Sequence, residues 1–168
     1  EFELYLFESN CKKHHNNVTL QNVAGLINRE IIGKYRMGGT NYAPPIKMIK
    51  SDYIKESKGF LSFKKKEVLD YPVYVIFITD GDNQDHSETE NVLRDISNHG
   101  VFFQFIGIGN ARLDFLQKLD NLSGRFIDNA NFFQVQNLGA MSDNDLYSKL
   151  LGEFPDWLKL AKQNNLIK

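Results

Sequence analysis

The alternation of apolar and polar stretches along the chain predicts a series of strands and helices. Residues 73–78 form a continuous run of β-branched, aromatic and aliphatic residues, which is typical of a strand covered on both faces in a parallel sheet. Residues 101–108 repeat this pattern. Between the two runs, residues 87–90 form a capping box that opens a helix, and this helix stops by Gly100. This spacing predicts a right-handed βαβ unit in which residues 73–78 are a central strand.

The rest of the chain carries further helical and strand patterns. Apolar residues at positions 20, 23, 24, 27 and 31 predict an amphipathic helix over residues 18–32 that ends near Gly33 and packs one face on a sheet. A second helix is predicted from Pro44-Pro45 to about residue 56, because proline suits the first turn. The polar stretch at residues 57–71, with its lysine run, is interpreted as a solvated surface connection rather than a phosphate-binding patch. The remaining predictions are strands at residues 2–7, 126–127 and 132–135, and helices at residues 113–119, 143–150 and 155–163.

Composition limits the size and the partners of the protein. With 168 residues, 42% of them hydrophobic, the chain is long enough to build one sizeable core. Its 20 basic and 21 acidic residues leave a net charge of −1, which favours neither nucleic acid nor an anionic membrane surface. The single cysteine, Cys11, cannot form an internal disulfide, and no apolar stretch approaches the roughly 20 residues that span a bilayer. We therefore expect one domain in a reducing cytoplasm.

Two segments place oxygen-bearing side chains at the ends of predicted elements. Thr40 follows a glycine pair and stands at the entry to the helix that begins near Pro44. Asp80 lies just past the carboxyl end of the strand at residues 73–78. Ligands of open parallel sheets gather at such strand ends, and Mg²⁺ prefers oxygen ligands. The sequence therefore indicates a cation site to which Thr40 supplies a hydroxyl and Asp80 a carboxylate.

The polar residues near the predicted cation site also allow other interpretations. A Gly-Gly-Thr before a helix is commonly a cap, and an Asp-Gly after a strand is commonly a turn, so each motif alone is weak. Residues 82–85 are interpreted as a polar loop that caps the next helix, with a separate Ca²⁺ site as the alternative. An EF-hand is excluded, because Asp85 stands where that loop needs glycine and Asn91 where it needs glutamate. His14-His15 near Cys11 lack a further ligand at metal-binding spacing and are interpreted as a surface loop.

The chain resembles the von Willebrand factor type A (vWA) family. That family combines three loops at its metal site: Asp-x-Ser-x-Ser after the first strand, a threonine after a glycine pair, and the aspartate of Thr-Asp-Gly. Thr40 and Asp80 match the second and third loops, whereas the first motif is not found. From residue 71 onward the chain resembles the vWA domains of bacterial tellurite-resistance and stress-response proteins. Residues 128–133 and 152–157 separate this subgroup from integrin-type domains.

The resemblance implies an α/β fold, a doubly wound and mostly parallel sheet with helices on both faces, similar to the Rossmann arrangement. Residues 1–168 would form a single vWA-like domain. Residues 2–7 would be a later strand, because only one helix fits between them and Thr40. The first strand and helix would then lie upstream of residue 1 or be absent. Without them two strand edges would be exposed, which predicts dimerisation or aggregation.

The resemblance also implies a protein-binding module. Thr40 would bind the metal directly or through water as the partner engages, and Asp80 would anchor it, often through water. The metal would be Mg²⁺, with Mn²⁺ or Ca²⁺ as alternatives, and an acidic side chain of a partner protein would fill the open position. A metal-independent scaffold with a degenerate site is the main alternative. A phosphatase-type enzyme is less favoured, because Gln84 stands where the Asp-x-Asp motif of those enzymes requires threonine.

Overall fold

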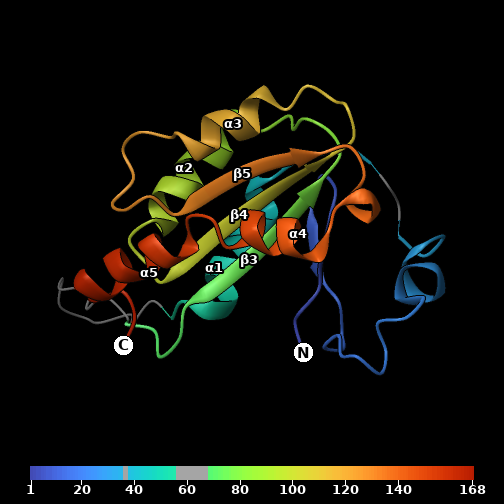
Figure 1. Ribbon diagram of the computed structural model, residues 1–168, viewed down its shortest axis with the longest axis horizontal. Coiled ribbons are helices and arrows are strands. Elements are labelled where there is room, and N and C mark those ends of the chain that lie inside the picture. The colour runs from blue at the N-terminus through green and yellow to red at the C-terminus, as the bar shows by residue number, and fades with distance from the viewer. Residues whose placement is uncertain (36–37, 56–67) are drawn as a thin grey trace.

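A parallel three-stranded sheet forms the centre of the molecule (Figure 1). The computed structural model describes residues 1–35, 38–55 and 68–168. The strands are β3 (Val73–Thr79), β4 (Val101–Ile108) and β5 (Ala130–Val135), in that spatial order. The helix α2 (His86–Ile96) connects β3 to β4. The predicted βαβ unit is therefore confirmed. The middle strand of the sheet is β4, which is buried along almost its whole length.

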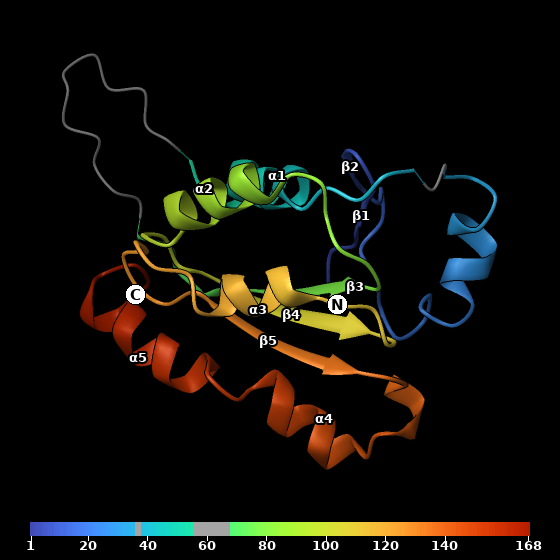
Figure 2. The same cartoon turned by 90° about the horizontal axis from the view of Figure 1, so that it is seen from above.

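Helices cover both faces of this sheet (Figure 2). One face packs against α1 (Ala43–Tyr53), α2 and α3 (Asp114–Asp120), and the other against α4 (Asp143–Leu150) and α5 (Phe154–Gln163). Successive side chains of a strand point to opposite faces, so Phe103 of β4 enters the core under α1–α3, whereas Phe102 lies 5.4 Å from the Trp157 ring of α5. The predicted α/β class with helices on both faces is confirmed. Within the described ranges, no helix is long and apolar enough to cross a membrane.

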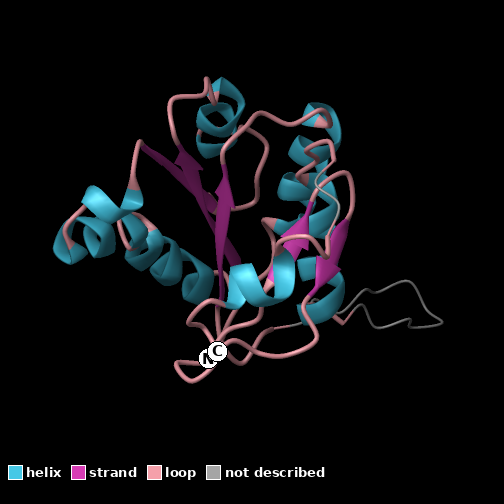
Figure 3. Ribbon diagram, turned by 90° about the vertical axis from the view of Figure 1, so that its right-hand side faces the viewer, coloured by secondary structure: helices cyan, strands magenta, loops and turns pink. Residues whose placement is uncertain are grey.

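The first residues form a separate hairpin beside the sheet (Figure 3). The strand β1 (Tyr5–Phe7) pairs in antiparallel register with β2 (Cys11–Lys13). The hairpin is tied to α1, because the Tyr5 hydroxyl donates to the Asp52 carboxylate at 2.7 Å. The strand predicted at residues 2–7 is therefore present but shorter, and its partner β2 was not predicted.

The helix predicted over residues 18–32 is wrong. This stretch forms turns followed by a short π-helical segment, η1 (Ile27–Ile31), and Leu20 is 91% exposed. Gly25, in the middle of the predicted helix, adopts a φ of 68° in the left-handed region, which interrupts the helix. In addition, the Arg29 side chain donates to the Ala24 carbonyl at 2.9 Å, a backbone group that a continuous helix would use.

Three further predictions fail at particular positions. β3 is an end strand of the three-stranded sheet rather than a central one, and Ile76 and Ile78 are 49% and 46% exposed. A continuous apolar run cannot tell how many neighbours a strand has. Residues 126–127 are bends rather than a strand, and α2 begins at His86, one residue before the predicted capping box. Most of the predicted connection at residues 57–71 lies outside the described residues.

Candidate functional site

Thr40 and Asp80 lie on neighbouring loops at the carboxyl end of β3. Asp80 directly follows the last residue of that strand, and Thr40 precedes α1 by a short turn. The loops are joined by a hydrogen bond from the Gln84 amide to the Thr40 carbonyl at 2.9 Å. Thr40 is half-buried and Asp80 is exposed. The structure therefore brings the two predicted loops together, while metal binding by these two side chains stays a prediction.

Asp85 holds the two loops in this arrangement. Its carboxylate accepts hydrogen bonds from the amides of Tyr42 at 3.0 Å and Ala43 at 2.8 Å, and from the Asn83 side chain at 2.6 Å. Burial raises the pKa of Asp85, but these hydrogen bonds outweigh the burial, so the pKa is lower than the ordinary value. The sequence interpretation assigned this loop to capping α2. The Asp85 side chain instead satisfies the first amides of α1, a contact that connects residues far apart in the chain.

Tyr42 lies at the base of the site, where burial and nearby carboxylates raise the pKa of its hydroxyl. The side chain is fully buried, and its hydroxyl donates to the Gly81 carbonyl in the loop after β3. Burial is the main cause that raises the pKa of Tyr42 to about 12. Three nearby carboxylates raise the pKa further, those of Asp82, Asp85 and Asp80. This end of the sheet therefore has a negative potential, which favours a cation.

A third loop, the turn between β1 and β2, also meets the site. The Asn41 amide donates to the Glu8 carbonyl at 2.9 Å. A Cβ atom at Gly38 would stand 2.5 Å from Glu8 Oε2, and one at Gly39 would stand 3.1 Å from Ser9 Oγ. A larger side chain at either glycine would therefore fit only if the ends of the Glu8 and Ser9 side chains moved. This turn was not predicted to be part of the site. The polar residues of the turn follow an alternating stretch at residues 2–7, and this change of pattern could have indicated it.

The ligand atoms at this site are few. No hydrogen bond or ion pair joins the Thr40 hydroxyl or the Asp80 carboxylate to another side chain in the described part of the chain. The aspartates at positions 80, 82 and 85 do not bring their oxygens close enough together to form a cluster of three ligands. Among the described residues, the one such cluster of histidine, cysteine, aspartate or glutamate lies elsewhere, at His14, His15 and Glu30.

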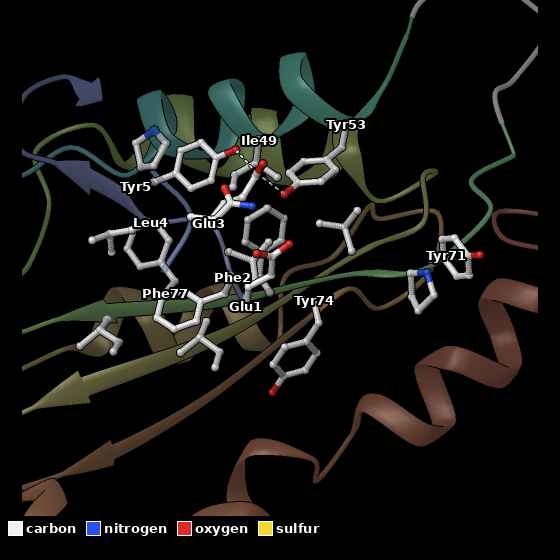
Figure 4. Close-up of a pocket in the computed structure, with 18 of the residues that line it drawn as sticks. Glu1, Phe2, Glu3, Leu4, Tyr5, Ile49, Tyr53, Tyr71, Tyr74 and Phe77 are labelled. Atoms are coloured by element: carbon white, nitrogen blue, oxygen red, sulfur yellow. Dashed lines mark hydrogen bonds between the residues drawn. The ribbon is translucent and has the colours of Figure 1, made fainter. Parts of the chain in front are cut away.

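A cavity of about 910 Å³ lies between the hairpin, α1 and the outer edge of β3 (Figure 4). Its wall is mostly apolar and includes Phe2, Ile49 and Phe77. Glu3 accepts a hydrogen bond from the Tyr53 hydroxyl on one side of this cavity, and its Oε2 atom also lies 2.9 Å from the Tyr5 hydroxyl. The hairpin and β3 thus face each other across a space that no described strand fills.

The parallel sheet covered on both faces, with oxygen-bearing loops at the carboxyl end of β3, defines a domain of the vWA class. The chain belongs to the vWA-TerF-like family, described as the vWA domain found in the TerF C terminus, which matches residues 1–167. This membership confirms the resemblance to the vWA family and to its tellurite-resistance subgroup.

This chain spans 58% of one similar protein and 34% of the chain in two similar crystal structures. YcbR, an uncharacterized protein of Bacillus subtilis (strain 168), is 37% identical over 154 residues, which are 90% of this chain and 58% of YcbR. Proximal thread matrix protein 1 from the mussel byssus, solved with a zinc-occupied MIDAS motif, gives a TM-score of 0.44 at 18% identity. A second crystal form of that protein gives a TM-score of 0.43 at 19% identity. In each case 95% of this chain covers 34% of the mussel protein.

Proposed function

We propose that this domain is a protein-interaction module in which Thr40 and Asp80 bind a divalent cation. The observation that carries the proposal is the convergence of their loops at the carboxyl end of β3, held by the Gln84–Thr40 hydrogen bond and by Asp85. The negative potential around Tyr42 supports the binding of a cation. A hydroxyl and a carboxylate match the oxygen preference of Mg²⁺, which keeps several waters.

The partner would be another protein that supplies an acidic side chain to the metal. With only two protein ligands, the ion keeps open positions that a carboxylate can fill. The family to which the chain belongs is described as the vWA domain of the TerF C terminus, and this supports a role in a cytoplasmic tellurite-resistance or stress-response system. The module would act by binding rather than by catalysis.

Calorimetric titration with Mn²⁺ and Mg²⁺ tests the proposal. We expect one binding site in the wild-type protein, weakened at least about tenfold in Thr40→Ala and in Asp80→Ala, because each change removes a ligand. The matched control is Asp114→Ala, which removes a carboxylate on α3 whose side chain is 81% exposed. This variant should bind the cation as the wild type does.

Equal binding in all four proteins would place the ion elsewhere. No binding in any of them would contradict the metal clamp and would favour a scaffold that binds its partners without metal. Thermal unfolding should show that each variant keeps its fold. Neither Thr40 nor Asp80 contributes a side-chain hydrogen bond to another described side chain, so we expect both changes to leave the fold intact.

A further inference from the structure

A second cluster of metal-ligand side chains lies where the hairpin meets η1. His14 directly follows β2, and its Nε2 atom lies 3.3 Å from Glu30 Oε2 of η1. The rings of His14 and His15 are 4.5 Å apart between centroids. One ligand atom from each of the three residues lies within 4.8 Å of the others. The sequence analysis gave His14-His15 no further ligand, but the structure brings Glu30 to them from another part of the chain.

The burial of His14 sets this cluster apart from a chance surface grouping. The His14 side chain is 2% exposed, whereas that of Glu30 is 27% exposed and His15 lies at the surface. Within the described residues, the buried Nδ1 atom of His14 has no hydrogen-bond partner. The candidate ligand atom is Nε2, which faces Glu30, and a metal bound there would place the ring proton on Nδ1. Either ring nitrogen of a neutral histidine can bind a metal.

The spacing and the ligand types point to one class of metal. A tetrahedral ion held at about 2.0 Å by its ligands places neighbouring ligand atoms about 3.3 Å apart. The His14–Glu30 separation of 3.3 Å equals this edge. Two imidazoles and one carboxylate suit Zn²⁺, whereas Mg²⁺ and Ca²⁺ prefer oxygen ligands alone.

We propose that His14, His15 and Glu30 form a Zn²⁺ site that fastens η1 to the end of the hairpin. His14 is the fixed ligand, and exposed His15 is free to turn its ring toward the ion. Arg29 Nε lies 3.6 Å from Glu30 Oε1, which leaves Oε2, the oxygen facing His14, for the metal. Three protein ligands leave one position for water. This site shares no residue with Thr40 and Asp80.

Titration of the 168-residue protein with Zn²⁺, and with Co²⁺ followed by its visible absorption, tests the site. We expect one tetrahedral ion per chain. His15→Ala and Glu30→Gln should each weaken binding at least about tenfold, because a ligand is lost. At a Zn²⁺ concentration one hundred times Kd, the melting temperature of the wild type should rise by about 5–10 °C.

Asn16→Ala, at an exposed neighbouring position, is the matched control and should keep both the affinity and the thermal shift. Asp80→Ala should also keep Zn²⁺ binding, which separates this site from the proposed clamp. His15→Ala and Glu30→Gln both leave the buried His14 in place, so they remove a ligand without opening the protein interior. Zn²⁺ binding that persists unchanged in His15→Ala and Glu30→Gln would overturn the proposal, and so would the absence of binding in the wild type.

Discussion

Replacing Asp85 by alanine should loosen the site and the fold together. The substitution leaves the amides of Tyr42 and Ala43 without their acceptor, and water can replace it only in part, because Asp85 is half-buried and both amides belong to fully buried residues. The loss of a helix cap costs about 0.5–2 kcal/mol, and each hydrogen bond to a charged group is worth about 1.5–3 kcal/mol. We expect the free energy of unfolding to fall by about 3 kcal/mol. For a chain of this length that lowers the melting temperature by about 6–12 °C.

The pH dependence gives this prediction a second readout. Because the pKa of Asp85 is lower in the folded protein than its ordinary value of 3.8, its carboxylate stabilises the fold above that pH. The contribution is lost as the pH falls below 3.8 through the folded pKa, so the difference between wild type and Asp85→Ala should shrink there. Urea unfolding between neutral and acid pH measures it. The control is Asp95→Ala, whose surface ion pair with Lys50 should cost at most about 1 kcal/mol. Equal losses in the two variants would refute the role given to Asp85.

Two further predictions concern the edge of β3 and a close contact behind the sheet. Ile78→Lys, which places a charge on the exposed edge of β3, should reduce concentration-dependent self-association in sedimentation velocity; a wild type that stays monomeric at high concentration would contradict this expectation. Gly100→Ala should lower the free energy of unfolding by about 1–3 kcal/mol in urea titration, because the new Cβ would stand 3.0 Å from the Leu166 carbonyl and would press on Ile167. An unchanged unfolding midpoint would show that these segments shift without cost.

Local sequence patterns predicted the elements whose bounds are marked by their own residues. β4 and α4 were predicted at their observed bounds, because an unbroken apolar run and a helical period each describe a single element. The periodicity at residues 18–32 predicted a helix because an apolar period takes no account of Gly25, which adopts a left-handed φ of 68° and interrupts it.

The candidate site divides in the same way. Thr40 and Asp80 were chosen because each borders a recognisable element, and their loops do meet, while their role as metal ligands stays a prediction. The parts that sequence reasoning missed depend on contacts between distant residues. Asp85 acts on the first amides of α1, and Glu30 reaches His14 from η1. Such pairings have no fixed spacing along the chain, so no local motif encodes them.

The hairpin contacts the three-stranded sheet without strand pairing, and this connects the two proposals. β1 pairs with β2 but not with β3, and the Phe7 ring meets the Phe77 ring of β3 at 4.6 Å through side chains alone. A contact of this kind lacks the backbone hydrogen bonds that fix strands in a ladder. The position of the turn between β1 and β2, which approaches Gly38 and Gly39, therefore depends on the other contacts of the hairpin. A Zn²⁺ ion at His14 would supply such a hold from the other end of β2, so Zn²⁺ should strengthen Mg²⁺ binding at Thr40 and Asp80 if both proposals are correct.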